Sequence, residues 1–308
     1  MTKVLILDSL FESLDVESEA ARSRAATVER WDGDSQSLAS AEIVAHVRTR
    51  LDADFIAAMP QCRVIARFGT GLDTVDAAAA SAAGITVVSV RDYCIPELPT
   101  HTLALAFALV RRLGETAGIV DSGWDEVAAQ TPISRYGRAT VVGVGSMGRR
   151  VVAALSALGY TVSAVTEHGR EEAQSAGAEV VPLEAGLASA DIVFLHAALD
   201  ETTRALIDER RLNVMRPGAI VVNTARIALL DEAAVATALE DGRLGGLALD
   251  AKLDPGSPLR RLLGSPRLLV TPHIGWYSDD AATALRAAAI TNALEAAVAH
   301  ERPEVQTR

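Results

Sequence analysis

Short apolar runs recur along the chain and are separated by longer stretches of helical character. In the first hundred residues, the runs at 3–8, 41–47, 63–68 and 85–90 are predicted to be β-strands. They lack the strict apolar–polar alternation of a strand with one wet face, and near-continuous apolar runs are typical of parallel strands covered on both faces. This region is therefore predicted to form one α/β domain.

The same pattern resumes in the second half of the chain. Strands are predicted at 139–142, 161–165, 179–181, 192–196, 219–223, 246–250 and 268–270. Six or seven strands joined by helices predict a doubly wound parallel sheet. An apolar helix is expected at 100–113, with a domain boundary near Pro99. An alanine-rich helix at 279–299 is expected to return to the first domain, so that residues 1–99 and 279–308 form one domain and 100–278 the other, with a cleft between them.

Length and charge narrow the class of partner. The chain has 308 residues, enough for two domains at about 150 residues each. Its net charge is −11, and no stretch of clustered Lys or Arg is present. A nucleic-acid footprint is therefore absent and an anionic membrane surface is not expected as a partner. A small ligand fits this composition better.

Neither the apolar runs of the chain nor its cysteines suggest secretion, membrane insertion or metal binding. The apolar run near the N-terminus is too short for a signal peptide, and the longest run, 103–110, falls well short of the roughly 20 residues that span a bilayer. Cys62 and Cys94 lie in no metal-ligand spacing. We expect a cytoplasmic protein with reduced thiols and no metal.

A glycine-rich stretch joins the strand at 139–142 to an apolar helix at 151–158. In the sequence GVGSMG, Gly143 suits a tight turn, Gly145 allows a pyrophosphate to approach the backbone, and Gly148 allows the helix to pack on the strand. Unpaired amides at the helix start then bind the anion. A bare strand-to-helix turn can look similar, so the surrounding sequence has to decide.

Three more stretches follow predicted strands, where ligands bind in open α/β sheets. The sequence RFGTGLD at 67–73 offers turn amides to a carboxylate, VNTAR at 222–226 places Arg226 at a strand end, and TPHIGWYS at 271–278 places His273 after a strand. Each has a plain alternative: an ordinary turn, a solvated charge and a structural histidine. His101 and His196 are interpreted as structural.

Together these stretches resemble the D-isomer-specific 2-hydroxyacid dehydrogenase family. The matching segments are GTGLDTVD, GVGSMG, LHAALDETTRALI, VVNTAR, GRLGGLALD and TPHIGWYS, in the family's order along nearly the whole chain. RFGTGLDTVD and TPHIGWYSDDA look closest to the branch of the C-terminal binding proteins, which sense NAD(H). The resemblance implies two Rossmann-like or flavodoxin-like domains and a nicotinamide cofactor.

The resemblance also implies roles for individual residues. His273 would protonate the substrate carbonyl, and Arg226 would pair with the substrate carboxylate through its planar fork of donors. Gly69, Thr70, Gly71 and Trp276 would contact the substrate. The cofactor would lie against Gly143, Gly145, Ser146, Met147, Gly148, Thr166, Glu167, Ala197, Thr224, Ala225, Asp250 and Gly275, with Asp250 accepting from the nicotinamide carboxamide.

The sequence departs from the family at three places. The family pairs its histidine with a glutamate in a Glu-Pro stretch; here Asp254 precedes the proline and is the candidate partner, although Asp-Pro-Gly-Ser is also an ordinary turn. Ile227 and Ala228 replace two glycines after the arginine. Thr166 stands where an acidic residue takes the ribose hydroxyls. Glu167 favours NAD and Arg170 would accommodate NADP, so NADP stays open.

The expected activity is reversible reduction of a 2-oxo acid to a D-2-hydroxy acid by a homodimer, with the 100–113 helix near the interface. The rival function is an NAD(H)-sensing scaffold with little turnover, which the missing glutamate favours and the presence of Arg226 and His273 disfavours. A third alternative, oxidation of an inorganic oxyanion, fits poorly with Trp276 in the pocket.

Overall fold

The chain folds into two compact units, which are described separately. The computed structural model describes residues 2–130 and 136–301, so residues 1, 131–135 and 302–308 of the expected domains lie outside the described part. One unit comprises Met1–Tyr93 and Ser278–Arg308, and the other comprises Cys94–Tyr277. The first junction precedes the predicted one because Pro99 does not break the helix: it lies in the first turn of α5 (Glu97–Val110), where proline's missing N–H is not needed.

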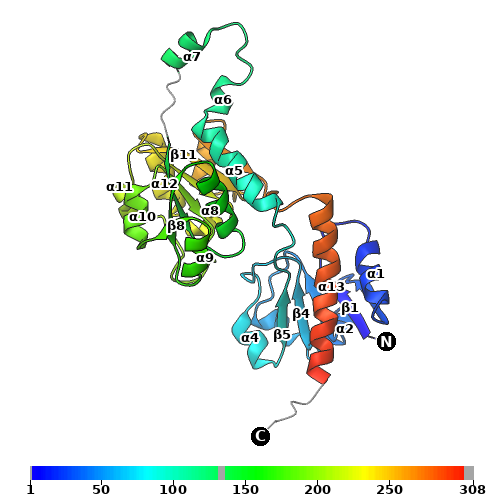
Figure 1. Cartoon of the computed structure of the whole chain (residues 1–308). Coiled ribbons are helices and arrows are strands. Elements are labelled where there is room, and N and C mark those ends of the chain that lie inside the picture. The colour runs from blue at the N-terminus through cyan, green and yellow to red at the C-terminus, as the bar shows by residue number, and fades with distance from the viewer. Residues whose placement is uncertain (1, 131–135, 302–308) are drawn as a thin grey trace. The chain divides into compact units, whose positions relative to one another are not determined.

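The first unit is built on a five-stranded parallel sheet in the order β2-β1-β3-β4-β5 (Figure 1). Its strands are β1 (Thr2–Ile6), β2 (Ala26–Arg30), β3 (Ile43–His46), β4 (Val64–Arg67) and β5 (Thr86–Ser89), and its helices are α1 (Asp15–Arg22), α2 (Ser35–Ala39), α3 (Ala53–Ala57), α4 (Ala77–Ala82) and α13 (Asp279–Glu301). The carboxyl ends of all five strands therefore meet at one edge of the sheet.

Strand β2 is not among the strands that the apolar runs predict. Only Ala26 of its five residues is buried, because β2 lies at the edge of the sheet and pairs with β1 alone. Edge strands expose much of their surface and need no continuous apolar run, so the run used to predict the other strands is absent here.

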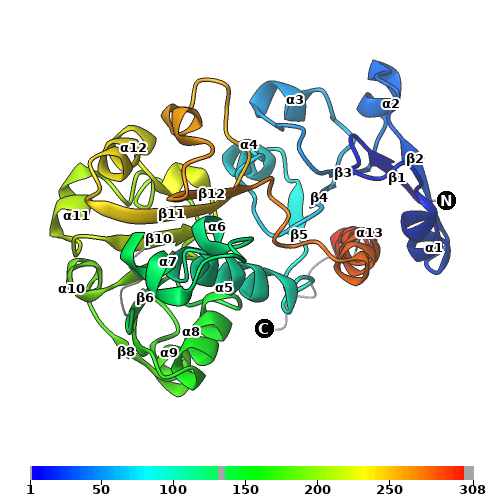
Figure 2. The same ribbon diagram turned by 90° about the horizontal axis from the view of Figure 1, so that it is seen from above.

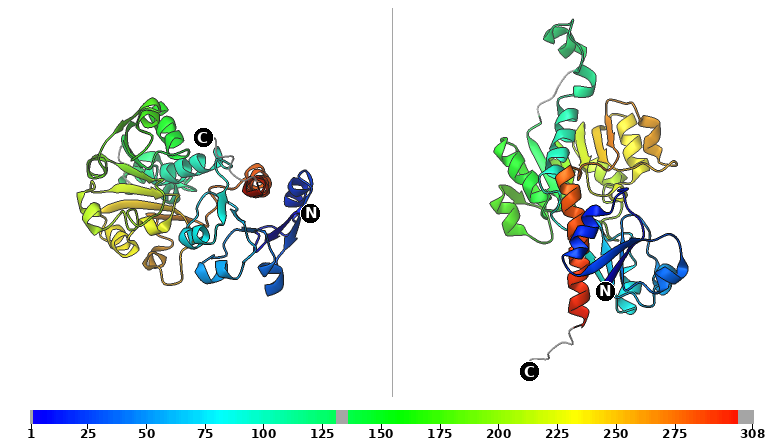
Figure 3. Two further views of the ribbon diagram at one scale, coloured as in Figure 1. Left: turned by 90° about the horizontal axis from the view of Figure 1, so that it is seen from below. Right: turned by 90° about the vertical axis from the view of Figure 1, so that its right-hand side faces the viewer.

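Helix α13 packs on α1 and on β3, β4 and β5. It runs beside α1 in Figure 3, and a buried ion pair joins the two: Nε and Nη2 of Arg286 donate to the two carboxylate oxygens of Glu17 at 2.8 and 2.6 Å. The same guanidinium lies 4.4 Å from the ring centroid of Phe11. Residues 269 positions apart in the sequence thus join the C-terminal helix to the N-terminal part of the same unit.

His46 is a fully buried histidine at the end of β3. Its Nδ1 lies 2.9 Å from the carbonyl oxygen of Thr49, and Asp8 accepts bonds from the amides of Val47 and Arg48 in the same loop. Burial and the charge of Arg67 lower the pKa of His46 to about 4. The ring is therefore neutral at pH 7.

Acidification is expected to destabilise the fold through His46. The unfolded histidine titrates near 6.5 and the folded one near 4, so the unfolded chain takes up the proton first, and stability present above pH 6.5 is lost as pH falls toward 4. Between about pH 7.5 and about pH 5 the loss from this group is about 2 kcal/mol. The test is urea unfolding of the wild type and of His46→Asn, which keeps a donor near the Nδ1 position, at both pH values. The free energy of unfolding should fall more in the wild type than in the variant, by that amount. Equal losses in the two proteins would contradict the assignment.

The second unit is built on a seven-stranded parallel sheet in the order β12-β11-β10-β9-β6-β7-β8. Its strands are β6 (Arg138–Val142), β7 (Thr161–Val165), β8 (Ala178–Val180), β9 (Ile192–Leu195), β10 (Ala219–Asn223), β11 (Leu244–Asp250) and β12 (Leu268–Thr271). Beyond α5, its helices are α6 (Leu113–Thr116), α7 (Trp124–Gln130), α8 (Gly148–Ala157), α9 (Arg170–Ser175), α10 (Leu183–Ser189), α11 (Glu209–Val214) and α12 (Glu232–Glu240), with short 3-10 turns η1 (Ile227–Leu229) and η2 (Pro258–Leu262). The strand order reverses between β6 and β9, which is the crevice where open α/β sheets bind ligands.

Both faces of this sheet are covered, as Figure 2 shows, with α10, α11 and α12 on one face and α5 and α8 on the other. Two core clusters result, and β9 contributes alternately to them: Val193 and Leu195 to one cluster, Ile192 and Phe194 to the other. This explains why the strands read as continuous apolar runs. Helices α6 and α7, between α5 and β6, project from the sheet in Figure 1.

Candidate active site

The glycine stretch forms a tight turn between β6 and α8. Gly143 has a φ of +89°, and a Cβ there would lie 2.5 Å from the amide nitrogen of Ala197, after β9. A Cβ on Gly148 would lie 2.1 Å from the carbonyl oxygen of Gly143. Both positions therefore require glycine, the first for its backbone conformation and both for close packing. Gly145 faces open space, with no heavy atom within 4 Å of a Cβ.

The turn has the features of a dinucleotide cradle. Within the described residues, the amides of Gly145, Ser146 and Met147 donate no hydrogen bond. They lie at the start of α8, where the helix dipole favours negative charge. Together with the open space at Gly145, these amides fit a pyrophosphate and make this end of the sheet suitable for a dinucleotide.

Thr166 and Glu167 follow β7, which is the neighbour of β6, the strand that leads into the glycine turn. The Thr166 hydroxyl donates to the carbonyl oxygen of His168, and Glu167 is exposed. Gly169, at φ +77°, closes this loop, and a Cβ there would lie 3.3 Å from a carboxylate oxygen of Glu172 and 3.5 Å from the carbonyl oxygen of Val144. The loop thus lies next to the glycine turn, as a ribose-binding loop must.

Arg226 follows β10 and is positioned by a buried asparagine. Asn223, only 2% exposed, accepts from the amide of Ala225 at 3.0 Å and donates to the carbonyl oxygen of Arg226 at 2.8 Å. Nη1 of Arg226 donates to the carbonyl oxygen of Ala225. Thr224 is held from α5 by a hydroxyl contact of 2.8 Å with Thr102. Asn223 is not among the predicted site residues, although a polar residue at the end of an otherwise apolar strand is a signal that could have indicated it.

His273 follows β12 in an unusual backbone conformation, with φ at +61°. Its Nδ1 lies 3.2 Å from the carbonyl oxygen of Asp250, and the indole Nε1 of Trp276 donates to the carbonyl oxygen of His273 at 3.1 Å. Because a carbonyl only accepts, Nδ1 carries the hydrogen when this bond forms. Nε2 is then the ring atom that can exchange a proton with a ligand.

The Asp250 carboxylate binds the loop that contains His273. It is 2% exposed and accepts from the amides of Ile274 and Gly275 at 2.8 and 2.7 Å and from the Thr271 hydroxyl at 2.7 Å. Three donors satisfy most of this buried charge. The carboxylate therefore already has a structural task besides the expected contact with a carboxamide.

Asp254 is exposed, and its backbone oxygen accepts from the Ser257 amide in a turn. Among the described residues its carboxylate forms no ion pair with His273. The geometry thus supports the turn and gives His273 a different partner, the Asp250 carbonyl. The pairing of Asp254 with His273 stays a prediction.

The Gly69-Thr70-Gly71 turn belongs to the first unit. Gly69 has a φ of +129°, and the Thr70 hydroxyl donates to the carbonyl oxygen of Val90. The amides of Thr70 and Gly71 donate no hydrogen bond in residues 2–130 and 136–301. These amides lie at the carboxyl edge of the five-stranded sheet and can bind an anion.

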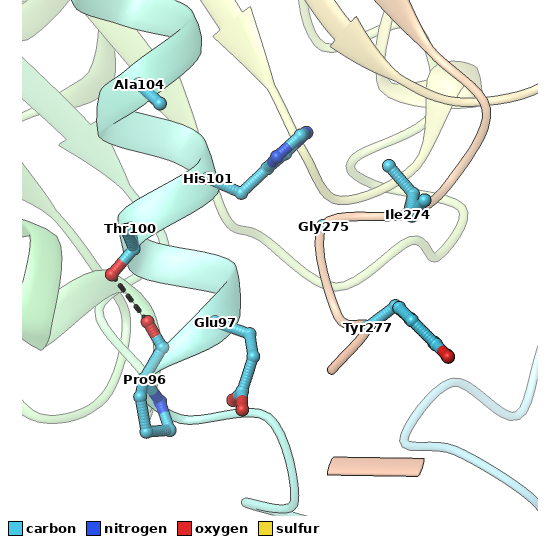
Figure 4. A pocket seen from close by; sticks show the side chains of 8 residues that line it. All are labelled: Pro96, Glu97, Thr100, His101, Ala104, Ile274, Gly275 and Tyr277. Atoms are coloured by element: carbon cyan, nitrogen blue, oxygen red, sulfur yellow. Dashed lines mark hydrogen bonds between the residues drawn. The ribbon is translucent and has the colours of Figure 1, made fainter. Parts of the chain in front are cut away.

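A cavity of about 420 Å³ lies between α5 and the loop at 274–277 (Figure 4). It is lined by Pro96, Glu97, Thr100, His101, Ala104, Ile274, Gly275 and Tyr277. Trp276 is half-buried and packs edge-on against Tyr277, with ring centroids 5.6 Å apart.

His196 follows β9, and its side-chain Nε2 is buried. Burial lowers the pKa of His196 to about 4.

The described part of the chain contains no group of His, Cys, Asp and Glu that could hold a metal ion. In the same residues, no helix combines the length and the apolar character needed to cross a membrane. Both cysteines are buried, and within the described residues neither forms a disulfide.

Several known proteins are similar to this chain in sequence or in fold. Residues 103–275 match the model for the family "D-isomer specific 2-hydroxyacid dehydrogenase, NAD binding domain". The glycerate dehydrogenase of Methylorubrum extorquens is 34% identical over 256 residues, which cover 80% of this chain and 79% of that protein. The D-3-phosphoglycerate dehydrogenase of Mycobacterium leprae is 34% identical over 238 residues, covering 76% of this chain and 44% of the longer relative.

Among solved structures, the D-lactate dehydrogenase of Aquifex aeolicus, complexed with NAD and lactic acid, matches with a TM-score of 0.86. The match covers 97% of this chain and 96% of that chain at 23% identity, and so shows the shared two-domain fold. The particular resemblance to C-terminal binding proteins stays a prediction. The family match and the relatives establish that the chain belongs to the D-isomer specific 2-hydroxyacid dehydrogenase family and is an NAD-dependent oxidoreductase of that family.

Proposed function

We propose that the protein reduces a small 2-oxo acid to the D-2-hydroxy acid with NADH, and catalyses the reverse reaction. One observation carries this proposal: Arg226 and His273 follow β10 and β12, at the same edge of the sheet as the glycine turn after β6. Asn223 and Asp250, both buried, hold the two loops in place. A fixed cation and a titratable ring beside a dinucleotide cradle suit hydride transfer to a 2-oxo acid.

In this proposal the Arg226 guanidinium pairs with the substrate carboxylate and draws electron density from the neighbouring carbonyl. Reduced nicotinamide, when bound, supplies the hydride. His273 gives the proton on Nε2 to the carbonyl oxygen and keeps the hydrogen on Nδ1, which donates to the Asp250 carbonyl. Solvent then returns one proton to Nε2, so each turnover consumes one NADH and one proton.

Trp276 stands three residues after His273, and its indole donates to the backbone of His273. We propose that the ring forms one wall of the substrate pocket and favours apolar or aromatic side chains. Ile227 and Ala228, the first two residues of η1, add bulk directly after Arg226. They are expected to restrict the size of the acid that Arg226 can bind.

The experiment that tests the function is consumption of NADH, with NADPH in parallel, against a panel of aliphatic, aromatic and acidic 2-oxo acids. The proposal predicts turnover with at least one acid and a preference for NADH. A protein that binds NADH tightly and turns over no acid in the panel would contradict the proposal and favour the sensing scaffold.

Replacing Arg226 with glutamine is expected to lower kcat/KM for the best 2-oxo acid by about 10²-fold, since the charge-paired binding of the carboxylate is lost. Arg226→Lys should recover only part of this loss, because lysine restores the positive charge but not the planar fork of donors. Initial rates with NADH measure the effect. Arg210→Gln, which removes an exposed ion pair with Glu184, is the control. Normal kinetics of Arg226→Gln would rule out its role in carboxylate binding.

We further propose that the protein is a homodimer joined through its second unit, near α5. The segment after α5 exposes several large apolar side chains, and clustered exposed apolar side chains are typical of an interaction surface. They are Leu113, Ile119, Val120 and Trp124, the last two more than 80% exposed. Light scattering of the wild type should give a molar mass of twice the chain mass. The Trp124→Asp variant should give a molar mass closer to that of one chain. A monomeric wild type would contradict this proposal.

A further inference from the structure

The loop that contains His273 holds a backbone conformation that a histidine rarely adopts. Its φ of +61° lies in the left-handed region, which costs a non-glycine residue about 1 kcal/mol or more unless the surroundings hold it. Within the loop, the His273 amide donates to the Thr271 carbonyl and the Tyr277 amide donates to the Ile274 carbonyl, both at 2.9 Å. The direction of the imidazole therefore depends on what fixes this loop.

The buried Asp250 carboxylate binds the two residues directly after the histidine. Oδ1 accepts from the Ile274 amide and Oδ2 from the Gly275 amide. Since the backbone oxygen of Asp250 also faces Nδ1 of His273, one residue positions both the loop and the ring. Asp250 thus contacts both the loop and the ring of His273.

Asp250 is itself held through Thr271. The Thr271 hydroxyl lies 2.7 Å from Oδ1 of Asp250, 3.3 Å from the Leu249 carbonyl oxygen and 2.9 Å from Nε2 of His101. The hydroxyl has one hydrogen, and both oxygens can only accept. The hydrogen therefore goes to an oxygen, the nearer being Oδ1, and Nε2 of His101 donates to the hydroxyl.

His101 comes from α5 and packs directly on the loop. Figure 4 shows its ring between the helix and the segment of Ile274 and Gly275. A Cβ on Gly275 would lie 2.8 Å from Cδ2 of His101 and 2.8 Å from Oδ2 of Asp250, so only glycine allows this approach. The chain of donors thus runs from α5 through Thr271 to the buried carboxylate and on to the His273 loop.

We infer that His101 and Thr271 are positioning residues for His273. They act through Asp250 and do not touch the substrate. The inference rests on the proposed function, in which His273 moves the proton. It also explains how the imidazole is oriented although Asp254 forms no ion pair with it.

Thr271→Val is the main test, because valine keeps the shape of threonine and removes only the hydroxyl. Asp250 loses one of three donors and His101 loses its acceptor, so the His273 loop can leave its strained conformation. We expect kcat to fall by about 10- to 100-fold, the effect of a displacement of about 1 Å at a catalytic group. The dissociation constant for NADH, from its fluorescence, should change by no more than about two-fold.

Two conservative variants and a control make this test specific. Thr271→Ser restores the hydroxyl and should bring kcat back to within about three-fold of wild type. His101→Gln retains a donor and should be less impaired than His101→Leu. Thr237→Val removes an exposed hydroxyl that bonds only within α12, and should leave kcat unchanged. An unchanged kcat in both Thr271→Val and His101→Leu would overturn the inference, as would a loss of NADH affinity as large as the loss of rate.

A double-mutant cycle separates this inference from the proposed function. If Thr271 acts only through His273, then Thr271→Val should have no further effect on kcat in a His273→Ala background. Additive losses would overturn the inference. If His273→Ala alone left kcat unchanged, the proposed function would fail, whatever the result at Thr271.

Discussion

Replacing His273 with alanine is expected to lower kcat by about 10²- to 10⁴-fold, the usual contribution of a positioned general acid. The loss should appear with every 2-oxo acid that the protein accepts. The ring's Nδ1 is bound to the Asp250 carbonyl, which leaves Nε2 for the proton, and alanine supplies neither atom. The affinity for NADH should stay within about two-fold, because the unengaged amides that fit its pyrophosphate lie in another loop, at 145–147.

Steady-state rates and NADH titration of the same preparation distinguish loss of chemistry from loss of binding. His300→Ala is the matched control, since His300 is an exposed histidine near the end of α13 whose Nε2 contacts the Thr86 hydroxyl. That variant should turn over at the wild-type rate. Full turnover by His273→Ala would remove His273 from the mechanism.

Arg286→Met is expected to lower the free energy of unfolding by about 3–5 kcal/mol, because it leaves the carboxylate of Glu17 buried without its cation. The Arg286 side chain is 11% exposed and that of Glu17 is 1% exposed. Water cannot replace the lost partner at so buried a carboxylate. Urea unfolding followed by circular dichroism measures the loss.

Two further variants identify the cause. Glu17→Leu combined with Arg286→Met should recover most of the stability, since an apolar pair leaves no buried charge. Arg24→Met removes an exposed ion pair with Glu295, which also joins α13 to the N-terminal part of the first unit, and should cost less than about 1 kcal/mol. If Arg24→Met cost as much as Arg286→Met, burial would not be the reason for the loss.

The strands that lie inside the sheets could be predicted because both of their faces are buried. β9 is apolar at every position, and its residues alternate between two cores. β2 could not be predicted in this way, because an edge strand with one buried residue has no apolar run. Helix α5 begins at Glu97, three residues before the predicted start at residue 100, because the first turn of a helix accepts a proline such as Pro99.

The positions of Arg226 and His273 could be predicted because each lies within three residues of the end of a strand in a parallel sheet. The contacts around them could not be predicted, since they depend on the path of each loop. Asp250 and Asp254 are four residues apart, yet only Asp250 reaches the His273 loop. Asn223 and Thr271 are ordinary polar residues in the sequence, and their roles follow from the hydrogen bonds that they form at strand ends.

The most direct test of the central claim is the configuration of the product. The 2-oxo acid that turns over fastest is reduced with NADH, and the 2-hydroxy acid is separated on a chiral column. We predict the D-hydroxy acid, formed in amounts equal to the NADH consumed. An L-hydroxy acid, or NADH consumption without a hydroxy acid, would contradict the proposed reaction.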